Sequence, residues 1–149
     1  GVFTTLLNES KEKDPHKCKV FISASAFDLN SFYSIKSKRK VSTNIKDPQW
    51  FQVELVRGSA IITGFRLIKS YLKSYKIVAT DDVNKNDDSW VTLFEIDEKV
   101  NRNEKTCDVF ELQNPSPLVR FVRLIKTGPN WDQRRELAFY HFDIFGYYF

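Results

Sequence analysis

Apolar and polar residues alternate along much of this chain. In the stretch 50–56, phenylalanine, valine and leucine alternate with glutamine and glutamate. A period of two residues is expected when one face of a β-strand packs against a core and the other face meets water. From position 19 onward, eight apolar or alternating runs are separated by turn residues, and we predict a strand in each of them: 19–26, 50–56, 60–68, 74–80, 90–97, 107–112, 120–126 and 136–149.

The turns between these runs favour an antiparallel architecture. Arg-Gly-Ser at 57–59, an Asp-rich segment at 81–88 and Thr-Gly-Pro-Asn at 127–130 are residue types that tolerate tight turns. Many short strands at a spacing of very roughly ten residues indicate an all-β sandwich or barrel rather than a parallel α/β sheet. The apolar residues within 2–7 have helical spacing, so we also predict a short N-terminal helical segment.

Composition agrees with an all-β fold and a single domain. The chain has 149 residues, Phe, Trp and Tyr make up 15% of it, and it contains 13 Phe but no Met. Aromatic side chains favour strands, and this length is usual for one domain with a real core. Because no initiator Met is present, we expect the sequence to be a fragment of a longer polypeptide. No window is apolar enough to predict a membrane span or a signal peptide.

The titratable residues argue against an enzyme. His16 lies in a polar segment and His141 within an aromatic strand, so they form no evident catalytic group. The sequence has no nucleophile elbow, phosphate-binding glycine loop or metal-ligand cluster, and we therefore predict no catalysis, no metal and no cofactor. The net charge of +4 comes from 23 Lys and Arg against 19 Asp and Glu. This small excess argues against a nucleic-acid-binding protein, which would need a concentrated basic face.

The order of the segments resembles the discoidin domain, also called the coagulation-factor type C domain, within the galactose-binding-like jelly rolls. The resemblance rests on Trp50 before an alternating strand, Gly64, the turn and second Trp of 81–90, Arg123, and Gly146 after the last strand pair. It covers nearly the whole chain and is closest to intracellular versions in protist proteins. It implies one domain over 1–149, an eight-stranded antiparallel jelly-roll sandwich, with a ligand surface formed by loops at one end.

Two departures from secreted members affect the expected ligand and location. Cys18 and Cys107 are both internal, whereas secreted members usually join their termini by a disulfide. We therefore expect a reducing, cytoplasmic location. The two cysteines could form a disulfide, but we favour the alternative in which both thiols are free. The first long loop of many sugar-binding members carries Asp and Gly, some of them helping to hold calcium. Here the segment 30–47 is basic and has no glycine, which weakens the expectation of calcium and galactose binding.

We assign structural roles to Arg123, Trp50 and Trp90. A guanidinium in the middle of a strand is costly unless it is paired or reaches water. The resemblance implies that Arg123 bonds an acidic group or loop carbonyls inside the sandwich, where it would brace a corner.

Two segments are candidates for the ligand surface. An exposed Trp with nearby Arg can anchor a protein partner or stack on a sugar ring, and the first segment carries Asn130, Trp131, Arg134 and Arg135. The alternative is that Trp131 folds back and caps the sandwich. The second segment is either a solvated loop or a docking surface for an acidic group, and its cations are Lys36, Lys38, Arg39 and Lys40.

Three functions remain at this point. The first is a non-catalytic adaptor that attaches its parent protein to an acidic protein partner, such as a cytoskeletal or ciliary assembly, through 29–47 and 127–136. The second is a carbohydrate-binding module in which Trp131 stacks on a sugar and Asn130, Arg134 or Arg135 bonds hydroxyls. The third, membrane attachment, is less favoured because Phe32 and Tyr33 form the only apolar tip.

Overall fold

The computed structural model describes residues 20–24, 41–42, 49–56, 58–83, 89–100, 104–133 and 136–149. The predicted N-terminal helical segment lies outside these residues. The described residues form ten strands: β1 (Val20–Ala24), β2 (Val41–Ser42), β3 (Trp50–Leu55), β4 (Ala60–Lys69), β5 (Ser74–Thr80), β6 (Val91–Asp97), β7 (Thr106–Glu111), β8 (Phe121–Lys126), β9 (Ala138–Phe139) and β10 (His141–Tyr148). Among the same residues, no helix has the length and apolar character needed to cross a membrane.

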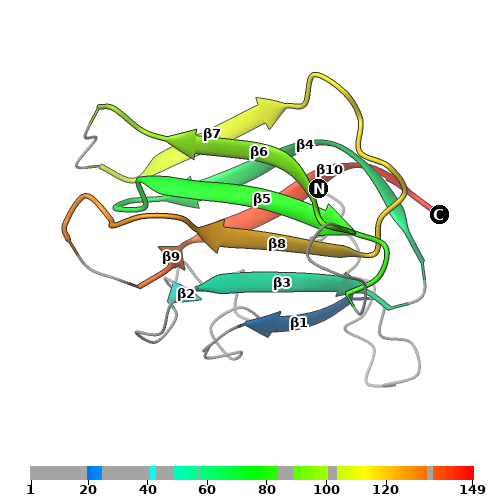
Figure 1. Ribbon diagram of the computed structural model, residues 1–149. Coiled ribbons are helices and arrows are strands. Elements are labelled where there is room, and N and C mark those ends of the chain that lie inside the picture. Colours follow the sequence, from blue (N-terminus) through cyan, green and yellow to red (C-terminus); the bar gives the residue numbers. More distant parts are fainter. Residues whose placement is uncertain are drawn as a thin grey trace.

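The strands form two principal antiparallel sheets (Figure 1). One sheet has five strands in the order β1-β3-β8-β5-β6, and the other has three in the order β10-β4-β7. A small third sheet pairs β2 with β9. Neighbours in the sheets are mostly distant in sequence, which is the arrangement of a jelly roll, and each of the eight predicted runs contains one strand of the two main sheets. The prediction of an eight-stranded antiparallel jelly-roll sandwich is therefore confirmed.

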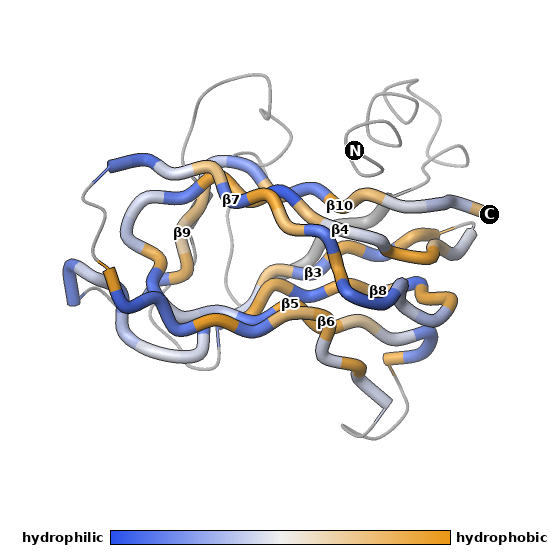
Figure 2. The backbone as a smooth tube through the Cα atoms, turned by 90° about the horizontal axis from the view of Figure 1, so that it is seen from above, coloured by the Kyte–Doolittle hydropathy of each residue, from blue (hydrophilic) through white to orange (hydrophobic). Residues whose placement is uncertain are grey.

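The core lies between the two sheets, which Figure 2 shows as two layers viewed from above. Alternate residues of β3 point into it, and Phe51, Val53 and Leu55 are all fully buried. Two aromatic clusters fill the space between the layers: Phe65 with Phe94 and Phe110, and Phe51 with Phe139 and Phe142. The apolar positions that recur every second residue in the sequence are thus the ones buried against the opposite sheet.

The connections gather at the two ends of the sandwich. The described loop residues 70–73, 98–100, 104–105, 127–133 and 136–137 lie at the left of Figure 1, and we call this the Trp131 end. The right of the figure shows the C-terminus and the described connecting residues 56, 58–59, 81–83, 89–90 and 112–120, and we call this the opposite end. A ligand surface built from loops must therefore lie at one end or the other, and the Trp131 end is the one that carries the predicted tryptophan.

Candidate ligand-binding end

The described parts of the three loops at the Trp131 end are joined by hydrogen bonds. The backbone N–H of Trp131 donates to the carbonyl of Tyr71 at 2.9 Å, and Thr127 N–H donates to the carbonyl of Ser74 at 3.0 Å. The N–H of Glu98 donates to the carbonyl of Lys73 at 3.1 Å. Because all three loops meet through main-chain atoms, their side chains are held at fixed relative positions.

The Trp131 ring is held on its polar edge and lies under a cation. Its indole Nε1–H donates to Oε2 of Glu98 at 3.4 Å, and the Lys73 ammonium lies 5.0 Å from the ring centroid. The ring is half-buried, while the neighbouring Tyr71 is exposed. The arrangement combines features of both sequence interpretations: the ring is anchored against the end of the sandwich, yet part of its surface still meets solvent.

A buried ion cluster lies beneath Trp131. Lys69 ends strand β4 with its side chain only 1% exposed, and its ammonium is 2.6 Å from Oε1 of Glu98 and 3.5 Å from Oδ2 of Asp108. The same Asp108 oxygen accepts a hydrogen bond from the Tyr75 hydroxyl at 3.0 Å. Glu98 therefore links the two levels of the site, with one oxygen on Lys69 and the other on the Trp131 indole.

Burial and charge act together on Tyr75. Burial of the hydroxyl, followed by the negative charge of Asp108, raises the pKa of Tyr75 far above its ordinary value. The group stays a neutral phenol that donates its proton to Asp108. Tyr75 therefore acts as a hydrogen-bond donor in this cluster, and it helps to hold Asp108 toward Lys69.

Asn130 is placed differently from Trp131. Its side chain is buried, and its Nδ2 donates to the carbonyl of Glu136 at 2.7 Å. This bond joins the turn at position 130 to the backbone at position 136. In this position the amide holds the turn, and contact with a ligand would require the turn to open.

The remaining predicted binding residues lie outside the described part of the chain. These are Arg134, Arg135, Lys36, Lys38, Arg39 and Lys40. One observation bears on whether the two predicted segments meet: β2 pairs with β9, so that Val41 lies opposite Phe139. The backbone just after Lys40 therefore runs beside the backbone just after the Trp131 loop. That the cations and Trp131 share one surface stays a prediction.

The three residues assigned structural roles contact one another on the outer face of the five-stranded sheet. The Arg123 guanidinium lies 4.4 Å from the ring centroids of both Trp50 and Trp90, and its Nε donates to Oε1 of Gln52 at 2.6 Å. Its strand neighbours Val122 and Leu124 are the ones that face the core. The resemblance implied a site inside the sandwich, but alternation along β8 turns Arg123 outward, where two indole rings enclose it.

Other titratable groups show no catalytic arrangement among the described residues. His141 is half-buried in β10, and burial, more than any nearby charge, lowers its pKa. Cys107 is exposed with a free thiol, whereas Cys18 lies outside the described part. Within the described ranges, no three His, Cys, Asp or Glu side chains are grouped so that they could hold a metal ion.

Sequence reasoning missed the ion cluster and the loop contacts that support Trp131. Lys69, Glu98 and Asp108 each lie at or near the end of a strand, where charged residues are ordinarily solvated. The one available signal was the alternation in 60–69, which places Lys69 on the same face as the buried Leu67. A lysine on the core face needs a buried acidic partner, and this reasoning could have found the cluster.

The chain matches no protein-family model and no curated protein. Solved structures with the same fold are numerous. The CBM32-5 module from Clostridium perfringens, in complex with GalNAc-β-1,3-galactose, has a TM-score of 0.67 at 13% identity over 86% of this chain and 96% of that one. The family 32 carbohydrate-binding module of Clostridium perfringens NanJ, in complex with galactose, has a TM-score of 0.62 at 11% identity over 85% and 93%.

A third similar structure is the fucolectin from striped bass (Morone saxatilis) serum. Its TM-score is 0.66 at 14% identity, over 87% of this chain but only 47% of that one. These structures support the galactose-binding-like jelly roll inferred from the sequence. The narrower likeness to intracellular protist versions stays a prediction.

The same comparisons contradict the predicted main function. The neighbours are sugar-binding modules and lectins, and none of the three is described as a protein adaptor. The prediction of attachment to an acidic, cytoskeletal or ciliary partner was therefore wrong. It relied on local positive charge, which does not identify a ligand, more than on the fold. The carbohydrate-binding alternative is the one that these structures favour.

Proposed function

We propose that this chain is a non-catalytic carbohydrate-binding module and that the Trp131 end is its ligand surface. The proposal draws on neighbours of the same fold whose descriptions name sugars or lectins. It draws on this chain through one observation, the anchored and partly exposed ring of Trp131 at an end built from loops.

The anchoring of Trp131 suits a ligand, such as a sugar, whose individual contacts with the protein are weak. The apolar C–H face of a sugar ring packs on an aromatic face, but such a contact has to outweigh the entropy lost when a mobile side chain becomes ordered. Here the main-chain bond to Tyr71 and the indole bond to Glu98 fix the ring before any ligand arrives. The ion pair with buried Lys69 fixes Glu98 in turn.

Polar groups for sugar hydroxyls surround the ring. Tyr71 is 39% exposed and offers a phenolic hydroxyl, and the half-exposed Lys73 offers an ammonium above the indole. These two groups can donate to hydroxyl oxygens, while the carboxylate of Glu98 can accept. A stacking ring with donors and an acceptor at its rim is the usual composition of a small-ligand site.

The test is a glycan array with the wild-type domain and two variants that each remove one aromatic ring. Trp131→Ala alters the proposed surface, and Tyr147→Ala removes an exposed ring from β10 at the opposite end as a matched control. Both variants should keep the wild-type circular dichroism spectrum. We expect saturable binding to at least one glycan, with and without a calcium chelator, and affinity at least about tenfold weaker in Trp131→Ala alone.

Two results would count against the proposal in different ways. A blank array at high protein concentration overturns carbohydrate binding itself. Binding that Trp131→Ala leaves unchanged keeps the function and moves the site away from this end.

A further inference from the structure

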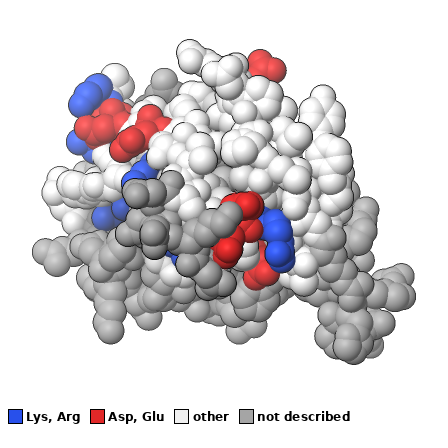
Figure 3. Space-filling view, turned by 45° about the vertical axis from the view of Figure 1, so that its right-hand side comes forward, with Lys and Arg blue, Asp and Glu red and all other residues white. Residues whose placement is uncertain are grey.

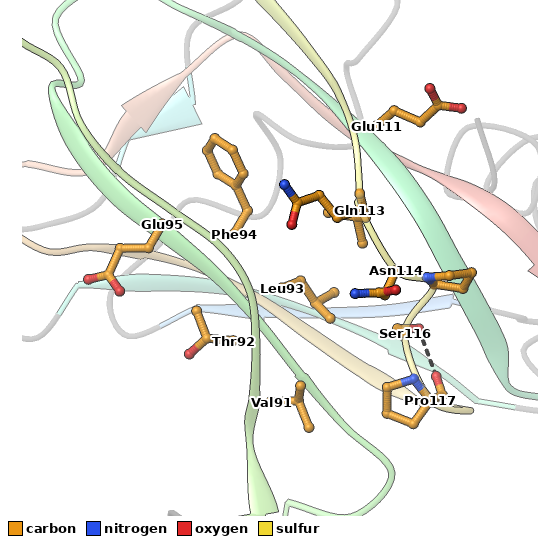
Figure 4. A pocket seen from close by; sticks show the side chains of 12 residues that line it. Val91, Thr92, Leu93, Phe94, Glu95, Glu111, Gln113, Asn114, Ser116 and Pro117 are labelled. Carbon is orange, nitrogen blue, oxygen red and sulfur yellow. Dashed lines mark hydrogen bonds between the residues drawn. The ribbon is translucent and has the colours of Figure 1, made fainter.

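A hollow lies along one side of the sandwich, where the edges of the two sheets face each other. It is a groove of about 580 Å³ between residues 91–95 of β6 and residues 111–117 at and after the end of β7 (Figure 4). Its size falls in the range of small-ligand pockets, roughly 300–1,000 Å³. It lies toward the opposite end, where β6 begins and β7 ends, and it shares no residue with the Trp131 end.

One wall of the groove is rigid. The N–H of Leu112 donates to Thr63 O at 2.8 Å, and Ser116 N–H donates to Ile62 O at 2.9 Å. The hydroxyl of Ser116 also accepts from Ile62 N–H at 2.8 Å. Since these bonds fasten both ends of the segment 112–116 to β4, its intervening side chains are presented on a fixed frame.

The other wall contains a β-bulge. The β5–β6 register shifts so that Ile77 lies opposite Phe94 but Val78 lies opposite Thr92, which leaves Leu93 as an extra residue. Figure 4 shows the side chains of both Leu93 and Phe94 directed into the groove. In a regular strand, consecutive side chains point to opposite faces, so the bulge is what lets two adjacent apolar residues line one site.

The groove presents free amides above an apolar floor. Gln113 and Asn114 extend from the rigid wall toward Leu93 and Phe94 (Figure 4), and neither amide bonds another described residue. Among the described residues that line the groove there is no Lys or Arg, and the acidic ones are Glu95 and Glu111. Figure 3 shows one face of the molecule, on which the described surface is largely uncharged and the charged groups are separate.

This chemistry narrows the class of ligand. Among the described lining residues, an anionic ligand would meet two carboxylates and no cation, which opposes binding. A peptide that adds as a β-strand needs a regular edge, and the bulge in β6 disrupts that edge. Amides that can both donate and accept, next to apolar carbons, match a ligand that has hydroxyl groups and an apolar face.

We propose that this groove is a second binding site, for a neutral glycan, independent of the Trp131 end. Gln113 and Asn114 bond the sugar hydroxyls, and Leu93 packs against its apolar face. With one site toward each end, the domain would bind a long or branched glycan at two points and gain affinity through the high effective concentration of the second contact.

The test is two-dimensional ¹⁵N NMR of the whole chain, titrated with galactose, mannose, fucose, lactose, cellobiose and chitobiose, and with glucuronate as a charged comparison. The side-chain NH₂ signals of Gln113 and Asn114 report on the groove, and the indole N–H signal of Trp131 reports on the other end. We expect a neutral sugar to shift the NH₂ signals, equally in the wild type and in Trp131→Ala. The double variant Gln113→Ala/Asn114→Ala should weaken the response of Leu93 about tenfold.

Tyr147→Ala is the control, because Tyr147 is exposed on β10, which β4 separates from β7, and it does not line the groove. This variant should respond as the wild type does. Shifts of the Trp131 indole signal alone overturn the groove site and leave the proposed function intact. Shifts of the NH₂ signals that disappear in Trp131→Ala also overturn it, because the two sites would then be one. Shifts at neither place overturn both proposals, and a stronger response to glucuronate overturns the assignment to a neutral ligand.

Discussion

Replacement of Lys69 by methionine tests the ion cluster under Trp131. Methionine has nearly the length of the lysine stem, so Lys69→Met removes the ammonium while it leaves little empty space. The side chain is 1% exposed, and its two acidic partners, Glu98 and Asp108, are 19% and 12% exposed. Both carboxylates would then lie largely buried without their cation.

The expected cost follows from this partial burial. Breaking a fully buried ion pair by removing one partner typically costs about 3–5 kcal/mol. Here some water reaches both carboxylates, so we expect about 2–3 kcal/mol of lost unfolding free energy. For a domain of this size that loss lowers the melting temperature by roughly 4–12 °C.

Urea denaturation followed by circular dichroism measures the change, with Lys76→Met as the control. Lys76 is a half-exposed lysine on β5, and the corresponding substitution there should change the unfolding free energy by less than about 0.5 kcal/mol. The triple variant Lys69→Met/Glu98→Gln/Asp108→Asn removes all three charges and keeps acceptors for Trp131 and Tyr75. It should recover much of the loss, because no uncompensated charge stays buried.

The reasoning is refuted if Lys69→Met unfolds at the same urea concentration as the wild type. It is equally refuted if the triple variant is no more stable than Lys69→Met. Either outcome would mean that water, rather than the ammonium, compensates the two carboxylates.

Three further predictions concern the backbone and the pH dependence. At Gly146, φ is +152° and a Cβ would overlap the carbonyl oxygen of Ile61. Gly146→Ala should therefore lower the unfolding free energy measured in urea by more than about 3 kcal/mol, or prevent folding. A small loss would contradict this close approach of the two backbones. A hydrogen bond from Ser74, and to a smaller extent one from Lys99, lowers the pKa of Asp97 from 3.8 to about 2. The ionised Asp97 therefore stabilises the fold above pH 3.8, and this stabilisation is lost as the pH falls through about 2. Ser74→Ala should raise that pKa in a ¹³C NMR titration, and an unchanged value would rule out the Ser74 bond as its cause. Burial lowers the pKa of His141 below 6.5, so the unfolded chain binds more protons just below that pH and stability should fall as the pH drops through this window; His141→Gln should flatten this dependence in pH-resolved thermal melts.

The sequence alone determined the strands and the class of fold. Alternation in segments such as 50–56 is a local property of the chain, and it survives because each strand buries one face against the opposite sheet. The same local logic identified Trp131 as the residue on which a site at this end would depend. These features could be read because they need only neighbouring residues and the requirement for a buried core.

Only the tertiary structure decided which residues hold Trp131 in place and where the side groove lies. Lys69 and Glu98 are 29 residues apart, and they meet because β4 and the loop after β6 end at the same side of the sandwich. The side groove likewise needs the bulge at Leu93 to face a segment that β4 holds from the other sheet. Such contacts join residues through strand order and register, which depend on the packing of the whole chain, and no local pattern of apolar and polar positions specifies them.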